Sequence, residues 1–155
     1  MSAYLALKWL HVLGATVLFG TGLGTAFHFW LAHRTGKAAL VAAAARSTVI
    51  ADFAFTLPAA ILQPLTGWAL ARTAGYPLDA PWILASFALY LLAGACWIPV
   101  VVLQLRMRDL AHRCAVDGTT LGPEYHKLAR IWFVLGWPAF AALVIVIGLM
   151  VARPA

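Results

Sequence analysis

Two histidines, His11 and His28, lie in the first apolar stretch of the sequence. They lie roughly 25 Å apart along a helix, and we expect both imidazoles on one face of it. Neutral imidazole is a common axial ligand of haem iron, and helix bundles build such sites between facing helices. His11 is the better iron ligand of the two because it lies deeper in the apolar stretch, and Met150 is a weak candidate for the second ligand. No C-x-x-C-H run is present, so the predicted cofactor is haem b, held without covalent attachment.

Small residues share the helix face of His11. Gly14, Ala15, Gly22 and Thr25 fall there, and small side chains leave a groove along the helix. Either a neighbouring helix or the flat edge of a cofactor fills such a groove in membrane proteins. Close helix packing and haem contact at Gly14 and Gly22 therefore both stay open.

The second apolar stretch carries a polar stripe that must face the bundle interior. Its members fall within about 40° of one direction: Thr48, Asp52, Thr56, Gln63 and Thr66. An acid inside a bilayer is costly unless it is paired or hydrated, so Asp52 is a candidate functional residue. Antiparallel alignment places Asp52 level with His28, where a carboxylate fixes the imidazole tautomer for metal ligation or proton relay. A local bond from Asp52 to Arg46 or Thr48 is the alternative.

The third stretch adds a further interior face. Ser86, Tyr90, Trp97 and Gln104 share one side of the helix by the same periodicity. Together with the histidines and the Asp52 stripe, these residues give the interior more polarity than an inert membrane anchor needs. We therefore expect the cofactor-binding residues to be His11, His28, Gly14, Gly22, Asp52 and Gln63.

Composition identifies an integral membrane protein. Of 155 residues, 64% are hydrophobic and 10% are charged, so apolar runs near 20 residues are membrane spans. The first run is too long for a signal peptide and is expected to be retained. The sequence predicts one all-α domain, residues 1–155, that forms an up-down-up-down transmembrane four-helix bundle. The predicted spans are 4–30, 47–71, 82–105 and 131–152.

The distribution of Lys and Arg predicts the orientation. Both links that join spans one to two and three to four are basic, whereas the other side carries only Lys8, Arg72 and Arg153. Basic residues collect on the cytoplasmic side, so both termini are expected on the periplasmic side of a bacterial inner membrane, in a multi-pass protein. The net charge of +6 then reflects topology and contact with anionic lipid headgroups, and no nucleic-acid partner is expected.

Several runs resemble a known bacterial family. WLHVLGATVLFGTGLGTAF, DFAFTLPAAILQPLTGWAL, LYLLAGACWIPVVVLQLRMRDLA and FVLGWPAF resemble the four-span membrane proteins grouped as domain of unknown function 2269. More distantly, the K-x-x-H pattern of Lys8 and His11 looks like that of HemJ-type four-helix proteins, which bind haem b. That resemblance implies His11 as a haem ligand. HemJ-type proteins also carry a functional lysine in the third span, which this chain lacks, so porphyrinogen oxidation is not expected.

Three functional hypotheses follow, and the sequence leaves open whether the chain is an enzyme. The first is a haem b protein that transfers electrons, with quinol, another membrane redox protein or a second copy of the chain as partner. The second is a cofactor-free structural or accessory subunit that packs against partner membrane proteins. The third, disfavoured because four spans leave little room, is a carrier or proton-coupled channel that uses Asp52 and Gln63.

Overall fold

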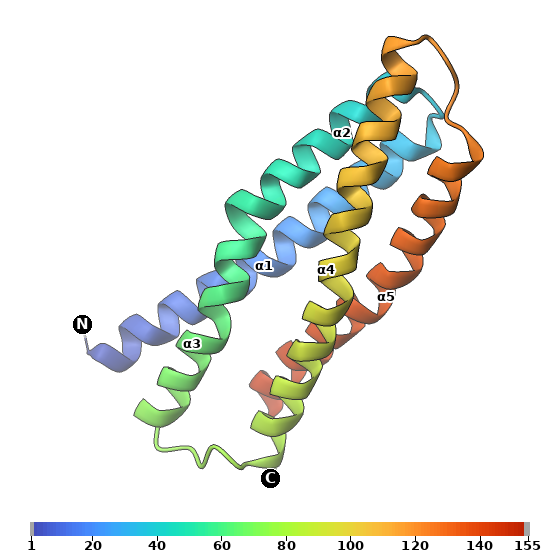
Figure 1. Ribbon diagram of the computed structural model, residues 1–155. Coiled ribbons are helices and arrows are strands. Elements are labelled where there is room, and N and C mark those ends of the chain that lie inside the picture. The colour runs from blue at the N-terminus through green and yellow to red at the C-terminus, as the bar shows by residue number, and fades with distance from the viewer. Residues whose placement is uncertain (1, 154–155) are drawn as a thin grey trace.

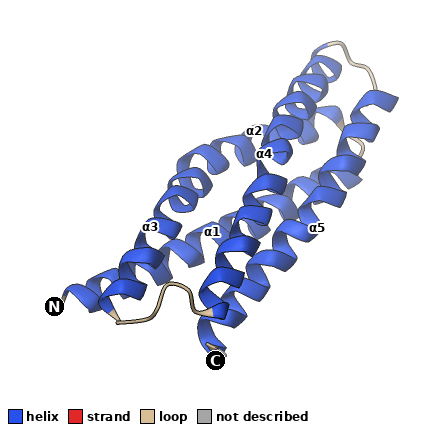
Figure 2. Cartoon of the chain, turned by 60° about the horizontal axis from the view of Figure 1, so that its bottom comes forward, coloured by secondary structure: helices blue, strands red, loops and turns tan. Residues whose placement is uncertain are grey.

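The computed structural model describes residues 2–153, and every element in that range is helical (Figures 1 and 2). Four rods are long and apolar enough to cross a membrane, which confirms the predicted four-span, all-α architecture. The second rod contains three elements in direct succession, two α-helices and a short π-helix. The elements are α1 (Ala3–Arg34), α2 (Ala38–Ala51), η1 (Asp52–Thr56), α3 (Leu57–Thr73), α4 (Pro81–Val116) and α5 (Pro123–Ala152).

The four rods run antiparallel, so the bundle has two distinct ends. The basic end carries the turns at residues 35–37 and 117–122, and the terminal end carries the turn at 74–80 and both chain termini (Figure 1). Gly36 and Gly118 each have φ of 66°, a left-handed conformation that lets the chain reverse within a few residues. α4 has 36 residues, or roughly 54 Å of helix, whereas a bilayer core is about 30 Å thick. The rods therefore extend beyond the hydrocarbon.

The tightly packed core lies at the basic end. There α2 packs against both α1 and α4, and α5 packs along α4. Small side chains at these contacts let the helix backbones approach closely, which is how membrane helices associate. The buried cluster comprises Phe29, Val41, Ala44, Ala45, Met107, Ala111, Leu121, Tyr125, Ala129 and Trp132.

Away from this core the bundle divides into two pairs. α1 stays against α3, and α4 stays against α5, while α1 and α5 make little backbone contact. The separation of the two pairs toward the terminal end is visible in both overall views (Figures 1 and 2). Aromatic side chains connect α1 and α5: Phe19 meets Phe140 across the gap with ring centroids 5.9 Å apart, and Phe29 meets Trp132 at 5.1 Å within the core. The interior between the pairs is therefore incompletely filled by backbone packing.

A clasp at the terminal end limits how far the pairs separate. Arg153, which follows α5, donates a hydrogen bond to the Tyr76 hydroxyl in the turn between α3 and α4. The same guanidinium lies over the Tyr76 ring at 5.3 Å from its centroid, and Tyr76 packs edge-on against Trp82. Cation–π and aromatic contacts of this kind stabilise partly exposed sites by roughly 0.5–1 kcal/mol each.

Two prolines shape the second rod. Pro58 has no N–H, so it cannot bond the carbonyl of Ala54 and complete a regular turn. Just before it, the Leu57 N–H bonds the Asp52 carbonyl, five residues back, which is the hydrogen bond of a π-helix. The widened turn accounts for η1 and turns the Asp52 and Thr56 side chains into the bundle, where both are buried.

Pro64 frees the carbonyl of Ala60, which a second helix then satisfies. In a regular helix this carbonyl accepts from the N–H at position 64, and proline has none. The Tyr90 hydroxyl on α4 donates to it at 2.7 Å. Because hydrocarbon offers no alternative donor, this bond ties α3 to α4 across the gap between the two pairs.

Removing this hydroxyl is expected to destabilise the fold. Tyr90→Phe leaves the Ala60 carbonyl unpaired and lowers the free energy of unfolding by about 1–3 kcal/mol. The matched control Tyr4→Phe, where the structure places no side-chain hydrogen bond, changes it little. In a Pro64→Ala background the helix supplies its own N–H, so Tyr90→Phe has a smaller effect there. Chemical unfolding in detergent micelles measures the free energy of unfolding of the wild type, both single variants and the double variant. An equal loss from Tyr90→Phe in both backgrounds would refute the link between Pro64 and Tyr90.

Candidate functional site

His11 lies between α1 and α3, where it is fully hydrogen-bonded. Its Nδ1 is 2.9 Å from the Thr66 hydroxyl, and that hydroxyl donates to the Leu62 carbonyl, so Nδ1 carries the proton. Its Nε2 is therefore the acceptor and faces the Gln63 amide nitrogen at 3.4 Å. A Cβ on Gly67 would lie 3.0 Å from the ring, so the α3 backbone packs directly against the imidazole.

Gln63 fills the space beside this histidine. Its amide nitrogen also donates to the His11 backbone carbonyl at 3.2 Å. Its oxygen lies against Gly14, where an added Cβ would approach to 2.6 Å. His11, Gly14 and Gln63 therefore come together at one place, where the His11 and Gln63 side chains form an interhelical hydrogen-bond network.

The remaining predicted site residues lie elsewhere. His28 is exposed on the outside of α1, so the expectation that it shares a face with His11 is wrong: 17 steps of 100° place it about 100° round the helix from His11. Within residues 2–153, His28 forms no hydrogen bond with Asp52, and neither Arg46 nor Thr48 pairs with that carboxyl. The predicted Asp52–His28 pairing and its local alternative are both wrong, because η1 turns Asp52 toward α4.

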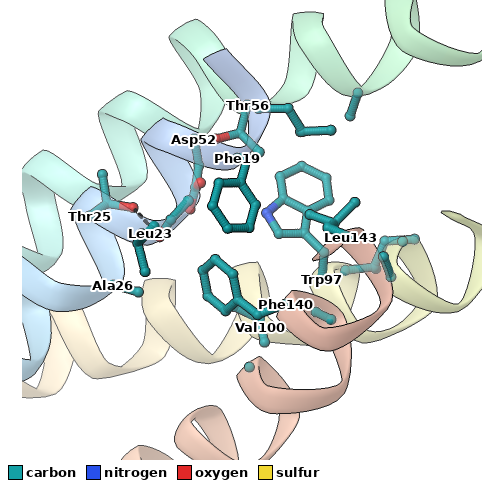
Figure 3. A pocket seen from close by; sticks show the side chains of 18 of the residues that line it. Phe19, Leu23, Thr25, Ala26, Asp52, Thr56, Trp97, Val100, Phe140 and Leu143 are labelled. Carbon is teal, nitrogen blue, oxygen red and sulfur yellow. Dashed lines mark hydrogen bonds between the residues drawn. The ribbon is translucent and has the colours of Figure 1, made fainter. Parts of the chain in front are cut away.

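The main feature of the interior is a central cavity of about 730 Å³ between the two helix pairs. All four rods line it, and most of its walls are aromatic or aliphatic (Figure 3). Gly22 contributes to the wall opposite Phe140, whose ring is 3.7 Å from the position of a Cβ on that glycine. Other lining side chains are Phe19, Leu23, Ala26, Ala60, Tyr90, Trp97, Val100, Phe140 and Leu143.

Asp52 marks the polar end of this cavity. It is 4% exposed, and the Trp97 side chain on α4 lies beside its carboxyl (Figure 3). Gln104, also on α4, is a second neighbour of the carboxyl. With the Gln104 amide nitrogen toward the carboxyl, it donates to Asp52 Oδ2 at 2.8 Å, and the Gln104 oxygen accepts from the Trp132 indole N–H at 3.2 Å. In the opposite orientation the Gln104 oxygen would face the Asp52 carboxyl oxygen, and the Gln104 amide N–H would face the Trp132 indole N–H. The first orientation therefore satisfies the hydrogen bonding of all three side chains.

The cavity also opens sideways. Leu23 and Phe27 on α1, and Phe133 and Trp137 on α5, line the cavity and are also exposed on the outer surface. We call this opening between α1 and α5 the side window. A membrane would place acyl chains against it, since the window lies within the apolar length of the rods.

The arrangement around His11 does not fit an axially ligated haem. The nitrogen that iron needs is the one facing the Gln63 amide, and the Gln63 side chain occupies the space beside Gly14. The cavity is large enough for a flat cofactor, yet no His, Cys or Met is among the described residues that line it. Across residues 2–153, no group of three or more His, Cys, Asp or Glu side chains is placed to hold a metal ion.

Sequence reasoning found the polar stripes and missed how they meet. Gln104 was expected on an interior face, but its pairing with Asp52 and Trp132 depends on the rotation of η1 and on the packing of α2 against α4. Phe19 and Phe140, which bridge α1 and α5 beside the cavity, carried no signal beyond their apolar character. Pro58 was the one available signal for the π-helix.

Residues 5–154 match the family described as "Predicted integral membrane protein (DUF2269)". The chain belongs to this DUF2269 family. The match covers all four rods, and it agrees with the apolar helices of the structure. No curated protein matches the chain, and no solved structure does. DUF2269 membership establishes an integral membrane protein, which contacts the lipid bilayer, and assigns no activity; the distant HemJ resemblance and the periplasmic orientation stay predictions.

The contact between Gly67 and His11 predicts a sharp size limit at position 67. Gly67→Ala places a methyl group 3.0 Å from the imidazole, so the ring must shift and its bond to Thr66 weakens. The expected loss is about 1–3 kcal/mol of unfolding free energy in detergent, despite the better helix propensity of alanine. Gly20→Ala is the control, because nothing lies within 4 Å of a Cβ there. Equal stability of the two variants would contradict the packing described for His11.

Proposed function

We propose that this DUF2269 protein binds a lipophilic molecule inside the membrane, in the cavity between its two helix pairs. The observation that carries the proposal is a cavity of about 730 Å³, lined by all four rods, with a buried carboxyl at one end. Small-molecule sites are typically cavities of roughly 300–1,000 Å³ with apolar walls and a few convergent polar groups. The interior between the helix pairs therefore has the size and lining of a binding site, which a bundle packed for stability alone does not need.

Packing supports this function. Protein interiors are close-packed, and voids much larger than a water molecule are few in a domain. An apolar void of this size forfeits dispersion contacts along its whole lining, so an apolar occupant stabilises the structure. Acyl chains or a dissolved lipophile are the molecules that a bilayer supplies at high concentration.

The side window provides the route of entry. Leu23, Phe27, Phe133 and Trp137 form its exposed rim, and none of them is charged. A lipophile passing between these side chains exchanges one apolar environment for another and loses no hydration. The polar end of the cavity at Asp52 then fixes which way round the molecule lies, since a few placed polar groups give a site its orientation.

Haem b binding and electron transfer, with quinol or another redox protein as partner, stay a prediction for this chain. They require the Gln63 amide to withdraw from His11 Nε2 and a second ligand to approach. The accessory-subunit hypothesis relied on free small-residue faces for partner proteins or a homo-oligomer. Gly14 and Gly22 instead face Gln63 and Phe140 of the same chain, so neither small residue supports a partner surface.

Blocking the cavity tests the proposal. Gly94 lines it, and a Cβ there meets no atom within 4 Å, so Gly94→Leu is chosen to add side-chain volume at the cavity wall. We expect native mass spectrometry of the wild type, released from phosphatidylcholine nanodiscs, to retain one tightly bound lipophile. Occupancy should fall by about tenfold or more in Gly94→Leu, equivalent to at least about 1.4 kcal/mol.

Gly148→Leu is the matched control, because a Cβ at Gly148 also meets no atom within 4 Å and this glycine lies outside the cavity lining. Its bound lipophile should equal that of the wild type. Thermal unfolding of both variants confirms that each is folded, and a filled void leaves Gly94→Leu at least as stable as the control. Equal occupancy in the two variants would eliminate the cavity as the binding site.

An absorption spectrum separates haem binding from lipophile binding. Protein purified from haem-replete cells, oxidised and then reduced with dithionite, is expected to show a Soret band only if haem b is bound. A band that His11→Ala removes and Gly94→Leu preserves would establish His11 as the ligand and require rearrangement of Gln63. From the hydrogen bonds described, His11→Ala should also lower stability by about 1–3 kcal/mol, whether or not haem is present.

A further inference from the structure

The chemistry of the polar end restricts what the cavity accepts, if the proposed binding function holds. Asp52 is the one acid among the described lining residues, and no Lys, Arg or His lines the cavity beside it. No ion pair to Asp52 occurs in residues 2–153. A carboxylate in a low-dielectric interior is strongly destabilised without a counter-charge, and buried charges in proteins are paired or bound to ions.

The neighbours of Asp52 within the protein supply no counter-charge for its carboxylate. Gln104 donates a hydrogen bond to Oδ2, and the Thr56 hydroxyl and Trp97 indole also lie beside the carboxyl; all three neighbours are neutral. One turn along, Thr56 is 4% exposed and lines the same cavity, and its hydroxyl lies beside the Asp52 carboxyl without forming a hydrogen bond of good geometry to any described residue. A hydroxyl that donates to a carboxylate keeps its own lone pairs, so the two side chains together leave oxygen acceptors with spare capacity.

The walls next to these oxygens are aromatic. Trp97 lines the cavity beside the Asp52 carboxyl, with its indole nitrogen turned toward that end (Figure 3). Phe19 and Phe140 meet edge to face farther along the same space. Aromatic faces attract organic cations, and the attraction is stronger in a desolvated site than in water.

We infer that the cavity binds a lipophilic organic cation, whose positive charge lies against Asp52 and whose apolar groups lie between Trp97, Phe19 and Phe140. The carboxyl supplies the opposite charge, the Thr56 hydroxyl supplies a free acceptor for an ammonium N–H, and the ring faces supply cation–π contact. The apolar part of the molecule fills the remainder of the cavity.

The same groups disfavour the other amphiphiles of a bilayer. A phosphate or carboxylate headgroup would meet the Asp52 charge with no basic residue of the lining to offset it. A neutral lipophile fits the walls and leaves the carboxylate without a counter-charge. The cation therefore gains an interaction that neither of the other two classes has, and specificity is that difference in binding free energy.

A matched pair of probes tests the inference. Tetraphenylphosphonium is a lipophilic cation, and triphenylphosphine oxide is a related uncharged molecule. Equilibrium dialysis against wild-type protein in phosphatidylcholine nanodiscs, with empty nanodiscs subtracted, gives saturable binding of each. We expect the cation to bind more tightly, and Asp52→Asn to weaken it more than about thirtyfold while leaving the uncharged probe unchanged.

Asp109→Asn is the charge control, because it removes one carboxylate from an exposed ion pair with Arg108, outside the cavity lining. Cation binding should survive in this variant and be lost in Gly94→Leu. Equal binding of both probes, or cation binding unaffected by Asp52→Asn, would overturn the cation inference while leaving lipophile binding intact. Failure of both probes to bind saturably would overturn the cation inference and the proposed function together. Retained binding of the uncharged probe shows that Asp52→Asn is folded.

Discussion

Close contact of α2 with α1 and α4 at the basic end fixes the position of every other element. Ala44, Ala45 and Ala111 are buried there, and their small side chains bring the helix backbones together. Because α2, η1 and α3 form one rod, this contact also sets where the π-helix turns Asp52. The two helix pairs diverge from that point, and the cavity is the space that their divergence leaves.

The interior follows one rule at several places: a polar group freed inside the rods is satisfied by a neighbouring rod. Tyr90 satisfies the Ala60 carbonyl that Pro64 leaves open, and Thr66 satisfies His11. Asp52 departs from this rule, since Gln104 satisfies its hydrogen bonding and nothing in the lining balances its charge. Departures from local consistency in natural proteins concentrate at functional sites, which is why Asp52 rather than His11 dominates the proposed function.

Periodicity and composition were sufficient to predict the four spans, the all-α architecture and the inward direction of the Asp52 stripe. Those features depend on hydrophobicity averaged over many residues, and Thr48, Asp52 and Thr66 are indeed buried. The partners of each polar residue were not predictable. They depend on a widened turn at η1, which rotates Asp52 off the regular 100° spacing, and on aromatic bridges between α1 and α5. His11, by contrast, was expected to present a nitrogen to iron and lies against α3 instead.

The side window determines by which path a ligand reaches the cavity of this protein. Its rim faces acyl chains, and the core at the basic end and the Arg153 clasp lie at either end of the bundle. A molecule that reaches the interior by this path arrives by two-dimensional diffusion within the membrane. Its occupancy then follows its mole fraction among the lipids, so a compound scarce in the surrounding water still reaches the protein once it partitions into the bilayer.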